Sequence, residues 1–310
     1  MCTMISTLNM PREEWLQLRK SGIGGSDAGA ICGLNPYASP MSVYRDKTSE
    51  DLSDLDSETM RQGRDLEDYV AHRFMEATGL KVRRSNMMYR CEEHPFMIAD
   101  VDRLIVGEDA GLECKTANAY NADKWKDGDV PLHYLMQCCH YMAVTGRSAW
   151  YIAVVILGQE FKYARIDRDD DLIAKLIAIE EAFWNQHVIP RIIPAPDGSK
   201  ACDEVLEQYF HRAKKASAIP LIGFDEKLNR RSELLGQIAE LEKEQRQIEQ
   251  EVKLYMEDNE LASSDHYRVS WTNVDTARLD TKRLKAEKPE IYQDFAKITS
   301  SRRLTIKAAS

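Results

Sequence analysis

The chain has 310 residues, of which 43% are hydrophobic, and a formal net charge of −9 at pH 7, so it can bury a substantial core as one large domain or one domain plus an appendage. The acidic total argues against a protein that coats DNA generically, but it allows a nuclease in which clustered acids bind metal beside a local basic groove. No apolar run approaches the roughly 18 residues that span a bilayer, and the seven cysteines include no C-x-x-C pair, so we expect a cytoplasmic protein with reduced thiols.

Two short helices joined by a glycine-rich turn are predicted near the start of the chain. Residues 11–20 place acidic side chains in a first helical turn and Arg19 near the end, which is typical of an amphipathic helix. The segment that starts at Gly22 (GIGGSDA) permits a tight backbone, and Ser26 or Asp27 can cap the following helix. Backbone amides at that helix start suit a phosphate, and Arg19 and Ser26 are natural additional ligands. The alternative interpretation is a capped loop with a solvated arginine.

A third helix is predicted over residues 40–47, an acidic loop over residues 48–58, and a long amphipathic helix over residues 58–77. Glu67 lies beside the apolar stripe of the long helix. A glutamate at the border of a buried stripe is usually solvated. It becomes a further metal-site carboxylate if this helix packs beside the strand that contains Asp102.

Two strands joined by a hairpin connection are the centre of the sequence. Residues 97–106 and 111–116 have the pattern of strands, and the residues between them have turn character. Residues two apart in a strand point to the same face, so Glu113 and Lys115 project together. Asp102 of the first strand then lies across from Glu113.

Paired carboxylates beside an ammonium group are suited to phosphodiester hydrolysis. Two carboxylates supply hard oxygen ligands for Mg²⁺, which keeps several waters, and a nearby lysine can orient or deprotonate one of them as a nucleophile. The alternative is a surface hairpin in which Glu113 and Lys115 form a same-face ion pair, which contributes about 0.2–1 kcal/mol. A bare E-x-K pattern does not decide between the two, so other parts of the chain have to.

A polar segment and a helix follow the central hairpin. In residues 120–130, Trp125 and neighbouring lysines are a weak indication of nucleic-acid contact. Residues 131–144 are predicted to form a helix, and its polar stripe faces either the site or the surface. The side chains of this stripe are Tyr134, Gln137 and Tyr141.

The next elements complete a first domain. Residues 149–157 predict a nearly continuous apolar strand, residues 160–166 a more clearly alternating one, and residues 169–188 an amphipathic helix. A proline-rich segment follows and ends this unit. We therefore predict a first domain over residues 1–196, which is a reasonable domain size.

The remaining chain predicts a helical arm and a small basic tail. Apolar residues from Leu234 to Tyr255 keep alternating spacings of four and three, interrupted by Gln245, as in a helical hairpin or a coiled coil. We predict a linker and arm over residues 197–260 and an α+β tail over residues 261–310. Within the tail, strands are predicted at residues 267–272 and 302–306, and helices at residues 281–286 and 289–297.

Five blocks of sequence occur in the order that is typical of one nuclease family. They are residues 19–33 (RKSGIGGSDAGAICG), 63–74 (GRDLEDYVAHRF), 98–105 (IADVDRLI), 111–116 (GLECKT) and 134–146. Through these blocks the chain resembles the YqaJ-like phage-type recombination nucleases, which are relatives of lambda exonuclease within the PD-(D/E)XK superfamily. The resemblance covers about residues 10–195, and the ordered set is more specific than any single block.

The resemblance implies a fold and a set of site residues. The fold is of the α/β (α+β) class, with a restriction-endonuclease-like PD-(D/E)XK core in which helices flank a mixed sheet. The family's phosphate-binding positions agree with the phosphate interpretation of the glycine-rich turn. The implied roles are metal binding by Glu67, Asp102, Glu113 and the Cys114 carbonyl, water positioning by Lys115, orientation of site groups by Gln137, and binding of the DNA 5′-phosphate by Arg19 and Ser26.

The resemblance also implies an activity and partners. The activity is that of an Mg²⁺-dependent 5′→3′ exonuclease on double-stranded DNA, with two ions per site and Mn²⁺ as a substitute, which leaves 3′ single strands for recombination. The implied partners are DNA ends and a single-strand annealing protein, without a membrane, and the implied assembly is a homo-oligomer, namely a ring-shaped trimer. One departure concerns the metal site: the family usually has Asp-Gly where this chain has Asp102-Arg103, so Asp100, which shares strand parity, is a rival ligand.

Two other functions stay open at this point. A structure-specific or end-independent endonuclease uses the same core, because the surrounding loops choose the DNA ends. A non-catalytic DNA-binding or scaffold protein would keep the fold and work through the C-terminal arm. Nucleases of the RecB type that hold an iron–sulfur cluster need four suitably placed cysteines, and the scattered cysteines here argue against that version.

Overall fold

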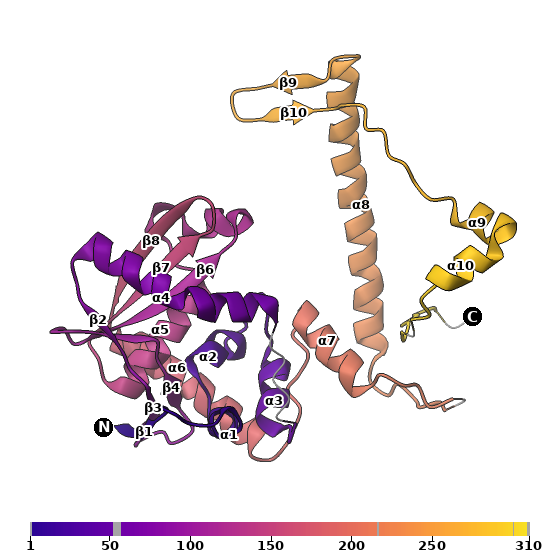
Figure 1. Cartoon of the computed structure of the whole chain (residues 1–310). Coiled ribbons are helices and arrows are strands. Elements are labelled where there is room, and N and C mark those ends of the chain that lie inside the picture. The colour runs from indigo at the N-terminus through magenta and orange to yellow at the C-terminus, as the bar shows by residue number, and fades with distance from the viewer. Residues whose placement is uncertain (1, 52–56, 216, 300, 309–310) are drawn as a thin grey trace. The chain divides into compact units, whose positions relative to one another are not determined.

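The structure is a computed structural model that describes residues 2–51, 57–215, 217–299 and 301–308. It divides into two compact units, Met1–His211 and Arg212–Ser310, and Figure 1 colours the chain from indigo to yellow. Residues 52–56, which belong to the predicted acidic loop, lie outside the described ranges.

The first unit contains a five-stranded sheet and a three-stranded sheet, with helices on both faces of the larger one (Figure 1). Its strands are β1 (Cys2–Ser6), β2 (Val82–Arg84), β3 (Met87–Cys91), β4 (Ile98–Asp100), β5 (Arg103–Ile105), β6 (Ala110–Ala117), β7 (Ala149–Ile156) and β8 (Glu160–Asp167). Its helices are α1 (Arg12–Lys20), α2 (Gly25–Ile31), α3 (Pro40–Thr48), α4 (Glu58–Thr78), the 3-10 helix η1 (Ala119–Gly128), α5 (Leu132–Thr145), α6 (Asp170–Phe183), the π-helical turn η2 (Trp184–Val188) and α7 (Lys200–Tyr209).

The larger sheet is mixed, as predicted. Its order is β2-β5-β6-β7-β8, in which β6 and β7 are parallel and the other neighbours are antiparallel. Every residue of β7 is buried, because α4 covers one face of the sheet and α5 covers the other. Side chains of β6 and β7 alternate between these faces: Leu112 shares an apolar cluster with Phe74 of α4, whereas the Trp150 ring lies 5.1 Å from that of Tyr141 in α5.

The strand predicted over residues 97–106 is two strands in different sheets, which corrects that prediction. β4 pairs with β3 in the three-stranded sheet β1-β3-β4, and β5 pairs with β2 and β6 in the larger sheet. The chain changes sheets at Val101 and Asp102, so Asp102 lies at the junction. The sequence pattern misses this break because apolar residues continue through it, while the pairing partners lie elsewhere in the chain.

Two further features of the first unit differ from prediction. The polar segment after β6 is the helix η1, and its Trp125 is buried with its ring stacked 5.7 Å from that of Tyr134, so it does not offer a surface to nucleic acid. The compact unit also extends past residue 196 to His211. The reason is that α7 packs on α3 through a small apolar cluster around Cys202.

The second unit consists of a long helix, a short hairpin and two short helices. These are α8 (Asp225–Met256), β9 (Leu261–Ser263), β10 (Arg268–Ser270), α9 (Thr281–Glu287) and α10 (Pro289–Phe295). Because α8 is continuous, the arm is a single helix, and the helical-hairpin alternative is wrong. Residues 302–306 form no strand in the described part of the tail, which corrects that prediction. No helix among the described residues is both long and apolar enough to cross a membrane.

Candidate active site

Strand β6 presents two charged side chains to the same face of the sheet. Glu113 is only 3% exposed, and Lys115 Nζ lies 2.6 Å from its Oε1. Lys115 Nζ also lies 4.6 Å from the ring centre of Tyr134, a residue of α5. Burial opposes the positive charge, but Glu113 and Tyr134 raise the pKa of Lys115 above its usual value. Lys115 is therefore an ammonium group that donates hydrogen bonds.

Asp102 lies opposite Glu113 at the junction of β4 and β5. The antiparallel register of β5 and β6, extended by one pair, joins these two residues. Asp102 Oδ2 accepts a 2.8 Å hydrogen bond from the backbone N–H of Cys114. Burial raises the pKa of Asp102 well above its usual value, and the negative charges of Glu113 and Glu67 raise it further. Close carboxylates in this setting favour the binding of a cation.

Helix α5 orients Glu113 through Gln137. The side-chain amide of Gln137 donates one 2.7 Å hydrogen bond to Glu113 Oε1 and another 2.7 Å hydrogen bond to the hydroxyl oxygen of Tyr141. The polar stripe of this helix thus faces the site and not the surface. The sequence assigned no role to Tyr141 beyond its place in this stripe, and its spacing of four from Gln137 is the signal that points to their contact.

The two residues predicted to hold a phosphate contact each other. Arg19 Nη2 donates a 3.3 Å hydrogen bond to Ser26 Oγ, and the Arg19 guanidinium lies 4.9 Å from the centre of the Trp15 ring. Trp15 Nε1 in turn donates a 2.8 Å hydrogen bond to Asp100 Oδ2. The carboxylate of Asp100, the rival ligand, is therefore held by Trp15 on the side of the cavity that Arg19 and Ser26 form.

The predicted groups meet around one cavity of about 170 Å³. Three of the predicted site residues, namely Glu67, Cys114 and Lys115, do not line this cavity. Two of these are nevertheless joined to it, Lys115 by its ion pair with Glu113 and Cys114 by its N–H to Asp102. The predicted site residues in the walls are Arg19, Ser26, Asp102, Glu113 and Gln137, together with the rival Asp100.

Close packing of α2 against α5 explains two glycines of α2, Gly25 and Gly29. A Cβ atom at Gly25 would lie 2.5 Å from Tyr141 Cε1, and one at Gly29 would lie 2.6 Å from His133 Cβ. Neither glycine has a positive φ, so the close approach requires glycine here, and turn geometry does not.

A buried lysine fixes the side of the cavity that Arg19 and Ser26 form. Lys47 Nζ of α3 lies 2.7 Å from Asp27 Oδ2 and donates a 3.1 Å hydrogen bond to the carbonyl oxygen of Arg19. Burial opposes ionisation of Asp27, but Lys47 and Arg19 lower its pKa below the usual value. Asp27 Oδ2 also accepts a hydrogen bond from the N–H of Gly24, which is the N-cap residue of α2 in place of the predicted Ser26 or Asp27.

Glu67 approaches the site from α4, on the opposite face of the sheet from α5. Its carboxylate forms an ion pair with Arg103, whose side chain is only 5% exposed. Arg103 also donates a 2.8 Å hydrogen bond to the carbonyl oxygen of Asp102, and its Nη2 lies 2.5 Å from Asp68 Oδ1. A buried guanidinium therefore connects Glu67 to the backbone of Asp102.

The residues around the cavity fit a divalent metal ion. Glu113 Oε2 is buried and has no hydrogen-bond partner among the described residues, so one carboxylate oxygen is left for an ion. Mg²⁺ is commonly bound by one or two carboxylates together with waters and substrate phosphates, which matches Asp102 and Glu113. Within the described ranges, no group of three or more His, Cys, Asp or Glu side chains could hold a metal by itself, and Glu67 is engaged by Arg103.

The chain is similar to known proteins along most of its length. The family model described as a YqaJ-like viral recombinase domain matches residues 14–148. The protein YqaJ of Bacillus subtilis (strain 168) is 40% identical to this chain over 306 residues, which cover 97% of this chain and 96% of that protein. The chain belongs to the YqaJ family. The resemblance predicted from the five sequence blocks is thereby confirmed.

Solved structures that resemble this YqaJ-family chain show its fold. A crystal structure of LHK-Exo in complex with dAMP aligns with a TM-score of 0.51 and 21% sequence identity, covering 64% of this chain and 97% of LHK-Exo. LHK-Exo is an alkaline exonuclease from Laribacter hongkongensis, and another crystal structure of it aligns with a TM-score of 0.49 and 23% identity, covering 56% of this chain and 91% of LHK-Exo. The predicted fold, a mixed sheet flanked by helices, is confirmed, and LHK-Exo shares it.

Proposed function

We propose that this YqaJ-family protein is a metal-dependent exonuclease that degrades double-stranded DNA in the 5′→3′ direction. The observation that carries the proposal is the meeting of Arg19 and Ser26 with Asp102 and Glu113 at one cavity. Groups suited to a terminal phosphate and groups suited to a metal ion then lie within the reach of one nucleotide. Family membership and a fold shared with an alkaline exonuclease support this function.

The contacts of each residue suit a role in this reaction. Asp102 and Glu113 would hold Mg²⁺, which when bound lowers the pKa of water and neutralises charge on the phosphate. The Lys115 ammonium, which pairs with Glu113, would position the attacking water, and Gln137 keeps Glu113 oriented. We prefer Asp102 to Asp100 as the ligand, because Asp100 is held by Trp15 whereas Asp102 faces Glu113. The Cys114 carbonyl is a further ligand in this proposal, and Glu67 joins it when its carboxylate leaves the ion pair with Arg103.

The proposal includes a cofactor, partners and an assembly, which family membership supports. The ion is Mg²⁺, with Mn²⁺ as a substitute and two ions per site. The substrate is a DNA end, and a single-strand annealing protein uses the resulting 3′ overhang. A ring-shaped trimer would keep the enzyme on its DNA between successive cleavages.

Digestion of linear and closed circular duplex DNA tests the proposed function. With Mg²⁺, we expect linear DNA to lose nucleotides from its 5′ ends while circles are spared, and labels placed separately on the 5′ and 3′ ends report the polarity. EDTA should stop the reaction, because the clustered carboxylates then have no ion to bind. Cut circles would instead indicate an endonuclease, and intact linear and circular DNA would indicate a non-catalytic DNA-binding protein.

The phosphate role of Arg19 predicts a loss of preference for phosphorylated ends. Arg19→Ala should reduce the ratio of the cleavage rate on 5′-phosphorylated ends to that on 5′-hydroxyl ends, because a charge-assisted contact to the phosphate is removed. The matched control is Arg12→Ala on the same helix, since the Arg12 guanidinium also lies over the Trp15 ring, at 4.1 Å. An unchanged ratio in Arg19→Ala would remove Arg19 from the phosphate site.

A further inference from the structure

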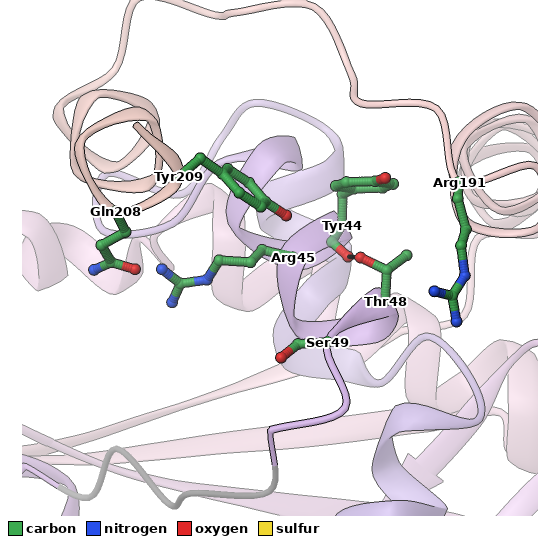
Figure 2. Close-up of a pocket in the computed structure, with 7 residues that line it drawn as sticks. All are labelled: Tyr44, Arg45, Thr48, Ser49, Arg191, Gln208 and Tyr209. Atoms are coloured by element: carbon green, nitrogen blue, oxygen red, sulfur yellow. Dashed lines mark hydrogen bonds between the residues drawn. The ribbon is translucent and has the colours of Figure 1, made fainter. Parts of the chain in front are cut away.

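A second cavity, of about 350 Å³, lies in the first unit between α3, α7 and the segment that follows η2. Figure 2 shows its lining side chains: Tyr44, Arg45, Thr48 and Ser49 come from α3 and its C-terminal end, Gln208 and Tyr209 from α7, and Arg191 from the segment after η2. The cavity shares no lining residue with the candidate active site.

Among the described residues, the cavity is lined by two arginines and by no acidic side chain. Neither Arg45 nor Arg191 forms an ion pair with a carboxylate within the described part of the chain. Other arginines of the first unit do, as in the pairs of Arg84 with Asp68 and of Arg168 with Asp170. In a protein of net charge −9, two unpaired guanidinium groups on one cavity mark a local site for anions.

The arrangement of the two guanidinium groups favours an extended polyanion over a single small anion. In Figure 2, Arg45 and Arg191 lie on opposite sides of Thr48, and their side chains run in different directions. Two guanidinium groups on different elements around one cavity offer separate contacts to successive phosphates of a nucleic-acid strand. The backbone of Arg191 is held in place, because its N–H donates a 3.3 Å hydrogen bond to the carbonyl oxygen of Val188.

Helix α3 connects this cavity to the phosphate side of the active site. Its buried Lys47 binds Asp27 and the carbonyl oxygen of Arg19, while Arg45 and Thr48 of the same helix line the cavity. We propose that the cavity binds the sugar–phosphate backbone of the DNA substrate outside the cleavage site, through Arg45 and Arg191. This inference rests on the proposed function, since it takes DNA as the substrate.

The salt dependence of DNA binding tests this inference. Each phosphate contact contributes about 0.9 to the slope of log affinity against log salt concentration for duplex DNA, so Arg45→Gln combined with Arg191→Gln should reduce the slope by about 1.8. Binding of a short 5′-phosphorylated duplex to the full-length protein is followed by fluorescence anisotropy in EDTA. Arg191→Gln alone should reduce the slope by about 0.9, and its exposed position leaves folding unaffected.

The matched control removes the same charge from exposed positions elsewhere in the first unit. Lys81→Gln combined with Lys175→Gln should leave the slope unchanged. Replacement of both Arg45 and Arg191 by lysine should retain most of the wild-type slope, because the charge is kept. An equal reduction in the control and the arginine pair would overturn the inference, because general electrostatics would then explain both. Competition by inorganic phosphate as strong as that by DNA would also overturn it, since an extended ligand would not be needed.

The failure of this inference differs from the failure of the proposed function. If the wild type degrades linear DNA but the arginine variants keep the wild-type slope, the cavity does not bind the substrate and the exonuclease proposal stands. If the wild type neither binds nor degrades DNA, both proposals fail together.

Discussion

Lys115→Ala should abolish DNA cleavage while DNA binding persists. Lys115 Nζ lies 2.6 Å from Glu113 Oε1, where its ammonium group can also donate to an attacking water or a phosphate oxygen. Removing one such donor from a preorganised site typically costs about 10²–10³-fold in rate, which would bring this activity to background. Release of labelled nucleotides with Mg²⁺ measures the rate, and fluorescence anisotropy in EDTA measures binding.

Two controls separate a catalytic role of Lys115 from a structural one. Glu113 keeps its hydrogen bond from Gln137 in the variant, so thermal unfolding should remain cooperative. Lys124→Ala is the matched substitution, because Lys124 Nζ also lies over an aromatic ring, 5.7 Å from the centre of Tyr37, but is exposed. We expect activity close to wild type in Lys124→Ala. Full activity in Lys115→Ala would reject the assigned mechanism.

The parts of the site that depend on local periodicity could be predicted from the sequence. Strand parity places Glu113 and Lys115 on one face, and helical spacing places Gln137 on the face of α5 that reaches Glu113. Both patterns need only the geometry of a single element. The family resemblance then supplied the roles, which local geometry does not contain.

The parts that depend on pairing between distant segments could not be predicted. The break at Asp102 arises because β4 and β5 find partners in different sheets, and β1, β2 and β3 are too short or irregular to show a period. The hydrogen bond from Trp15 to Asp100 joins residues far apart in the chain. The two glycines of α2 are explained only by the distance to α5 and not by any turn. Such contacts exist only once the elements are packed.

Arg103 is the residue for which sequence and structure differ most in what they suggest. In the sequence it is only a departure from the usual Asp-Gly of the family. In the structure its side chain is 5% exposed and contacts the carboxylates of Glu67 and Asp68 and the carbonyl oxygen of Asp102. A buried guanidinium stays charged only when such partners compensate it, so we expect these contacts to contribute to the free energy of unfolding.

Arg103→Met should therefore lower the free energy of unfolding by about 3 kcal/mol, because removing one partner of a buried ion pair leaves the others uncompensated. This is the lower end of the usual range, since Glu67 and Asp68 retain contact with water. Arg84→Met is the matched control, because Arg84 pairs with the same Asp68 at 2.5 Å but is 57% exposed, and it should cost less than about 1 kcal/mol. Urea unfolding of both variants measures the difference.

Divalent ions should restore part of the stability that Arg103→Met loses. Without the guanidinium, Glu67 is free to join Asp102 and Glu113, and its negative charge strengthens cation binding. Mg²⁺ or Mn²⁺ should therefore raise the unfolding temperature of Arg103→Met more than that of the wild type. Arg84→Met should respond like the wild type. Equal small losses in the two variants, with equal responses to the ion, would show that Arg103 contributes no more than a surface pair. A larger response confined to Arg103→Met would instead place Glu67 within reach of the ion.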